Sequence, residues 1–77
     1  MSEYEIVKKC HIEINNIVNS EKYSVFTKCF ALGKTSANIR ELYKFGEMRK
    51  SSYNKLQSHI KRAMHQVHND FIERGFY

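Results

Sequence analysis

Residues 51–77 have the sequence SSYNKLQSHIKRAMHQVHNDFIERGFY, and this stretch decides the fold class. Its apolar residues recur at three- and four-residue steps, the spacing that lines one side of an α-helix. They are Tyr53, Leu56, Ile60, Ala63, Met64, Val67 and Phe71. The opposite side carries hydrogen-bond donors and no carboxylate. Its members are Asn54, Lys55, Ser58, Arg62, His65 and Asn69. The stretch therefore predicts one long amphipathic helix with an apolar face and a basic face.

Two earlier segments show the same helical periodicity. The first covers about 3–18, with Cys10 and Ile14 on its apolar stripe. The second follows Ser20, a residue type that caps helix N-termini because its hydroxyl accepts from a free amide. It ends at Gly33, because glycine readily adopts the left-handed conformation that closes a helix. We expect the apolar residues of both segments to be buried, including the aromatic residues Phe26 and Phe30. Tyr53 and Phe71 of the last helix are expected to be buried as well.

A short third helix is predicted over 37–45, with Thr35 or Ser36 as its N-cap and Gly46 at its end. The pair Ser51 and Ser52 then caps the fourth helix. No segment alternates with period two, so no strand is expected. The sequence therefore predicts an all-α fold in which residues 1–77 form a single compact domain of four helices.

The charge is unevenly distributed along the 77 residues. The net charge is +5, and residues 1–32 contribute none of it because their lysines and glutamates are equal in number. Between Lys34 and Arg62, eight basic residues face only Glu41 and Glu47. Such a localised positive field attracts polyanions such as DNA, RNA or an acidic protein surface. Since a chain of this length has a modest core, a homodimer is a further expectation.

The composition places the chain in the cytoplasm. Cys10 and Cys29 have neither the spacing of a redox motif nor the density of a disulfide scaffold, so we expect two buried thiols in a reducing compartment. No apolar run approaches the length of a membrane span, and the polar N-terminus does not resemble a targeting segment. We expect no cofactor and no contact with a membrane.

The third and fourth predicted helices form a candidate helix-turn-helix within residues 36–68. In such a motif a short turn containing glycine joins two helices, and the second helix presents a basic outer face. Here the turn runs through Gly46 and Met48. The free amides of Ser51, Ser52 and Tyr53 are expected to bind a phosphate at the positive end of the helix dipole.

A limited family resemblance supports this interpretation. The run Leu56-Gln57-Ser58-His59-Ile60-Lys61-Arg62-Ala63, preceded by Gly33-Lys34-Thr35-Ser36 and Ile39, resembles the helix-turn-helix of sigma-factor region four and of small pilus-operon regulators. The likeness covers roughly residues 26–67 and implies a recognition helix with an aliphatic-x-x-x-aliphatic-x-Arg-Ala pattern. Two registers remain open. One directs Asn54, Lys55 and Ser58 at the bases, and the other directs Gln57, Lys61 and Arg62.

The sequence thus predicts a DNA-binding transcription regulator, or an accessory factor of a mobile element. Polar and basic residues that precede or belong to the last helix are the candidate nucleic-acid-binding residues. They are Lys34, Arg40, Lys44, Arg49, Lys50, Ser51, Ser52, Asn54, Lys55, Ser58, Lys61, Arg62 and His65.

Three other functions were weighed. The first is a small helical interaction protein, an inhibitor or adaptor, that presents its basic helix to an acidic protein partner. The second is a zinc site at His59, His65 and His68, but no carboxylate or cysteine completes the ligand set. The third is RNA cleavage by Arg62 and His68, which lie too far apart around the helix for a shared cleft. We therefore expect no metal and no enzymatic activity.

Overall fold

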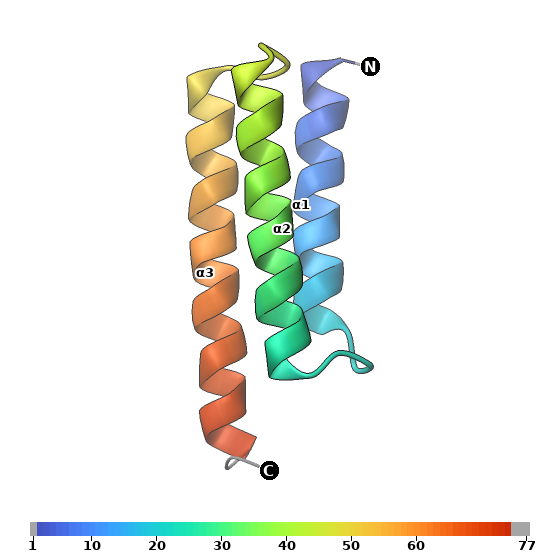
Figure 1. Cartoon of the computed structure of the whole chain (residues 1–77), viewed down its shortest axis with the longest axis vertical. Coiled ribbons are helices and arrows are strands. Elements are labelled where there is room, and N and C mark those ends of the chain that lie inside the picture. The colour runs from blue at the N-terminus through green and yellow to red at the C-terminus, as the bar shows by residue number, and fades with distance from the viewer. Residues whose placement is uncertain (1, 75–77) are drawn as a thin grey trace.

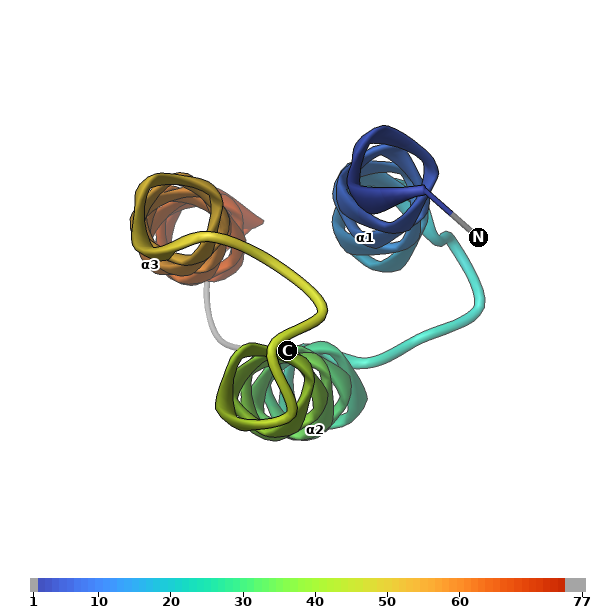
Figure 2. The ribbon, with the colours of Figure 1, turned by 90° about the horizontal axis from the view of Figure 1, so that it is seen from above.

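The computed structural model describes residues 2–74, which form three α-helices and no strand. The helices are α1 (Glu3–Asn19), α2 (Val25–Lys44) and α3 (Lys50–Arg74). In the view of Figure 1 they run alternately down, up and down, so that each is antiparallel to the next along the chain. Seen from above, the three helices stand at the corners of a triangle (Figure 2). The all-α class is confirmed.

The predicted count of four helices is wrong, because the second and third predicted helices are one continuous helix, α2. Gly33 lies in the interior of α2 and does not end it. The reason is that Leu32 and Ile39, on either side of Gly33, are both fully buried. A seven-residue step is two helical turns, so an unbroken helix brings both side chains to the core. This burial outweighs the cost of about 1 kcal/mol for an interior glycine.

The helix ends also differ in part from the prediction. Ser20 is the C-cap of α1, and the N-cap of α2 is Ser24, whose side chain accepts from the Thr27 amide. Gly46 follows the end of α2 at φ 76°, in the left-handed region that was expected of it. Helix α3 begins at Lys50, so Ser51 and Ser52 lie in its first turn and do not precede it. Gly75, Phe76 and Tyr77 lie outside the described residues.

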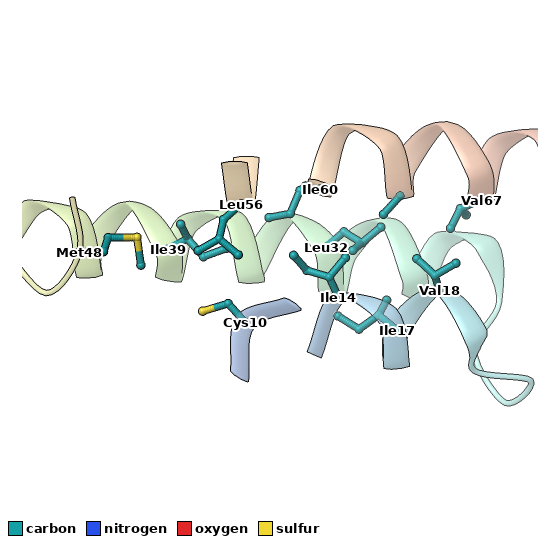
Figure 3. Close-up of a cluster of buried hydrophobic side chains, with 11 residues drawn as sticks. Cys10, Ile14, Ile17, Val18, Leu32, Ile39, Met48, Leu56, Ile60 and Val67 are labelled. Atoms are coloured by element: carbon teal, nitrogen blue, oxygen red, sulfur yellow. The ribbon is translucent and has the colours of Figure 1, made fainter. Parts of the chain in front are cut away.

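The hydrophobic core runs along the axis of the bundle. The eleven buried hydrophobic residues are Cys10, Ile14, Ile17, Val18, Leu32, Ile39, Met48, Leu56, Ile60, Ala63 and Val67. Figure 3 shows that they come from all three helices and from the turn before α3. Ile39 and Met48 belong to the same cluster as Leu56 and Ile60, so α2 and the turn pack against α3.

Several residues that were expected in the core are on the surface. Phe26 and Phe30 keep 89% and 70% of their surface exposed, and Cys29 is exposed as well. The error follows from the four-helix prediction, because one continuous helix buries only a single stripe of α2. That stripe contains Leu32, Thr35 and Ile39. No helix within residues 2–74 is long and apolar enough to cross a membrane.

Candidate nucleic-acid interface

The start of α3 is partly covered by the first residue of α1. The Glu3 carboxylate accepts from the Arg49 amide at 2.8 Å, from Arg49 Nε at 3.0 Å and from Ser52 Oγ at 2.9 Å. The contact is possible because the antiparallel topology brings the N-terminus of α1 next to the turn between α2 and α3 (Figure 1). The negatively charged carboxylate of Glu3 thus lies where α3 begins.

This carboxylate changes the expected role of three candidate residues. Arg49 and Ser52 already bind Glu3, and the Tyr53 amide donates to the Arg49 carbonyl at 3.0 Å. The Arg49 amide lowers the pKa of Glu3 to about 2, with further contributions from the Arg49 side chain and Ser52. The expectation that the Tyr53 amide is free is therefore wrong. The Glu3 carboxylate already lies at this end of the helix, bound to the Arg49 amide.

The outer surface of α3 beyond its first turn is exposed. Its apolar stripe, with Leu56, Ile60 and Val67, faces the core and turns the polar residues outward. We call the exposed polar residues of this side the basic face. It consists of Lys50, Ser51, Asn54, Lys55, Ser58, Lys61, Arg62 and His65. No carboxylate occurs in α3 before Asp70.

A contact between α2 and α3 involves Gln57, a residue of one of the two registers left open by the sequence. Gln57 is half-buried, accepts from Ser36 Oγ at 2.7 Å and donates to the Ser36 carbonyl at 3.2 Å. Gln57 therefore belongs to the helix contact. Lys61 and Arg62, from the same register as Gln57, are exposed together with Asn54 and Lys55 from the other. The basic face includes cations from both registers.

The α2 candidates divide between two sides of that helix. Arg40 and Lys44 follow Ser36 at four-residue steps, which turn progressively away from α3, so they lie on the outer side of α2. Lys34 instead lines a groove between α1 and α2, together with Ile12 and Glu13 of α1. Its Nζ lies 5.8 Å from the centre of the Phe30 ring. Lys34 is therefore separated from the basic face, and Arg40 and Lys44 face outward from α2.

On its other side, the basic face ends at a pair of histidines that join α3 to α1. His11 Nδ1 and His59 Nδ1 lie 2.7 Å apart, and His59 Nε2 lies 3.2 Å from Asn15 Oδ1. Since an amide oxygen only accepts, His59 Nε2 donates to Asn15, and His59 Nδ1 accepts from His11. Burial lowers the pKa of His59, and the neighbouring His11 and Arg62 lower it further. The lowered pKa favours the neutral form of His59 in this contact between α3 and α1.

The three histidines considered for a zinc site are not brought together. His65 and His68 are exposed, and His59 points to α1. Among residues 2–74, no group of three or more His, Cys, Asp or Glu side chains is placed to hold a metal ion. The contacts of Glu3 and His11 could not be predicted from the sequence, because neither residue belongs to a local pattern and both make contacts across the bundle.

Comparisons with protein-family models, with curated proteins and with solved structures found no match for this chain. The fold and the exposed side chains define it as an antiparallel three-helix bundle with a basic outer face on its last helix.

Proposed function

We propose that this protein binds DNA through the basic face of α3 and acts as a transcription regulator or an accessory factor. One observation carries the proposal: the outer side of α3 has no carboxylate from Lys50 to Asn69, and its cations are exposed. Within the described residues, the basic face forms no ion pair. The ion pair found there joins Arg49 to Glu3, and Arg49 lies outside this face. An uncompensated row of this kind attracts phosphates.

The proposed mode of binding uses α3 as a recognition helix. The major groove of DNA is wide enough to admit one α-helix. Asn54, Ser58 and Arg62 recur at four-residue steps along the middle of the basic face, so they would reach base edges together. Lys50 and Lys61 flank them and would contact phosphates. Because α2 and α3 are antiparallel neighbours, the proposal depends on the exposed side of α3 and not on a crossing between the two helices.

Charge removal on the basic face tests this proposal. We expect Lys55→Ala combined with Arg62→Ala to weaken binding of duplex DNA by at least about tenfold, since phosphate contacts dominate affinity. Fluorescence anisotropy with a labelled duplex measures the change. The matched control is Lys8→Ala combined with Lys9→Ala, which removes two exposed lysines from α1. Equal losses in the two double variants would show that binding follows net charge and not the basic face.

A second candidate function is binding of an acidic protein. It is favoured by the groove between α1 and α2, which has an apolar lining of Ile12, Ile17, Tyr23 and Ala31 and is also lined by Lys9, Lys22 and Lys34. A partner helix in this groove would complete a four-helix bundle. Affinity purification with and without nuclease separates the two functions. Survival of a stoichiometric protein complex after nuclease treatment would favour the protein partner.

A further inference from the structure

The outer side of α2 carries an exposed stripe that no described part of the chain covers. Its residues follow one another at alternating four- and three-residue steps, the spacing of a helix-packing seam. We call this set the α2 stripe, and it consists of Phe26, Phe30, Gly33, Ala37, Arg40 and Lys44. All six residues are exposed. The stripe is divided by chemistry, with aromatic residues at one end, small residues in the middle and cations at the other.

The two aromatic residues of the stripe leave an apolar surface in water. Phe26 is the most exposed large hydrophobic residue of the described chain, at 89%, and Phe30 is 70% exposed. In the middle of the stripe the backbone itself is accessible. A Cβ atom added at Gly33 would have no neighbouring atom within 4 Å. A second helix could therefore approach α2 closely at this point.

The residues along the stripe are complementary to those of a second copy of the stripe that runs in the opposite direction. If a second α2 packs antiparallel about a two-fold axis near residue 35, Phe26 lies opposite Lys44 of the other copy and Phe30 lies opposite Arg40. Gly33 then lies opposite Ala37. Every aromatic ring thus meets a cation, an attractive arrangement, and the small residues meet where the helix axes approach most closely. Lys34 and Phe30 already make one such cation–π contact within the chain.

We propose that two copies of this chain form a symmetric dimer through antiparallel packing of their α2 stripes. The antiparallel direction is selected by charge. In a parallel pair, Arg40 and Lys44 would face the same cations of the other copy, whereas the antiparallel pair places each cation over an aromatic ring. The stripe spans about 27 Å of helix. This dimer does not depend on DNA binding, because the stripe lies on α2 and the basic face lies on α3.

Sedimentation equilibrium over a wide concentration range tests the proposal. We expect a monomer–dimer equilibrium whose dissociation constant rises by about tenfold or more in Phe30→Ala, because each cation–π pair occurs twice in a symmetric dimer. Phe45→Ala is the matched control, since Phe45 is 76% exposed and lies outside the stripe. A chain that remains monomeric at all concentrations would overturn the proposal. Equal effects of Phe30→Ala and Phe45→Ala would overturn it as well.

Three further variants distinguish this interface from nonspecific association. Gly33→Leu should abolish the dimer while the helical circular dichroism spectrum is kept, since position 33 has open space in the monomer. Phe30→Arg alone should also abolish it, because Arg40 of the other copy would face a cation. The double variant Phe30→Arg with Arg40→Phe exchanges the two partners and should restore the dimer. Failure of the exchange to restore it would overturn the antiparallel pairing.

Discussion

At the scale of single residues, two contacts between α1 and α3 decide how the start and the side of α3 are presented. Glu3 binds the turn before α3, and the side chains of His11 and His59 form a hydrogen bond between α1 and α3. Each pairs residues more than forty positions apart in the chain. Each also involves a group whose pKa is shifted by its surroundings. Their contributions to stability therefore depend on pH in ways that can be measured separately.

The Glu3 contact should contribute to stability at neutral pH and lose its contribution in acid. The pKa of Glu3 falls from 4.5 to about 2 in the folded chain, mainly because the Arg49 amide donates to the carboxylate. A lowered pKa means that the folded state favours the ionised form, so the stabilisation is present above pH 4.5 and is lost as the pH falls toward 2. We expect Glu3→Gln to reduce the free energy of unfolding at pH 7 and to flatten its decline over this interval. Urea unfolding at a series of pH values measures both effects, and Glu21→Gln in the α1–α2 loop is the control.

The His11–His59 contact should weaken in mildly acidic solution. The pKa of His59 lies below its ordinary value of 6.5, first because of burial and then because of His11 and Arg62. The unfolded chain therefore binds a proton more readily than the folded chain, and the free energy of unfolding decreases as the pH falls below 6.5. We expect His59→Ala to remove this dependence. His65→Ala, at an exposed histidine of the same helix, should leave it in place. A pH profile that is unchanged in His59→Ala would contradict the assignment.

At the scale of elements, the three helices differ in how well local patterns predict them. Helix α1 is expected over 3–18 and found over 3–19, and α3 begins one residue before its expected start. Both have one clear apolar stripe and no interior glycine or proline. Helix α2 has a weaker stripe and contains Gly33, so its local pattern resembles two short helices. Local propensity is worth about 1 kcal/mol at one glycine, whereas burial of Leu32 and Ile39 is worth more.

The two glycines of this region should respond in opposite ways to alanine. Gly33 is helical and has open space around it, so Gly33→Ala should raise the free energy of unfolding by about 0.5–1 kcal/mol. Gly46 has φ 76°, so Gly46→Ala should lower it by about 1 kcal/mol despite similar open space. Urea unfolding at low protein concentration measures both changes. A destabilising Gly33→Ala would contradict a continuous α2.

At the scale of the whole molecule, different helices of the bundle present surfaces of different chemistry. The contact between α1 and α3 is polar and includes Glu3, His11 and His59. The outer side of α3 is basic, and the outer side of α2 carries the α2 stripe. In an antiparallel three-helix bundle each helix has an outward side that neither neighbour covers. Two such sides can therefore serve different partners, DNA on α3 and a second copy on α2.

If α3 binds DNA, the affinity should fall steeply as salt rises. Each phosphate neutralised by a lysine or arginine releases counterions, which gives a slope of about −0.9 per contact in a plot of log affinity against log salt concentration. Lys61→Ala should reduce the slope by about one and weaken binding to all sequences similarly. Anisotropy titrations at several salt concentrations measure the slope. A salt-independent affinity would contradict phosphate contacts by the basic face.

The amino-acid sequence by itself determined the helical class, the apolar stripes of α1 and α3, and the concentration of positive charge in the second half of the chain. These properties follow from the spacing and type of neighbouring residues, which act within one helix. Only the tertiary structure decided that α2 is continuous, that Glu3 occupies the start of α3, and that Phe26 and Phe30 are exposed. Each of these depends on residues far apart in the chain, because burial and long-range hydrogen bonds exist only once the helices have packed.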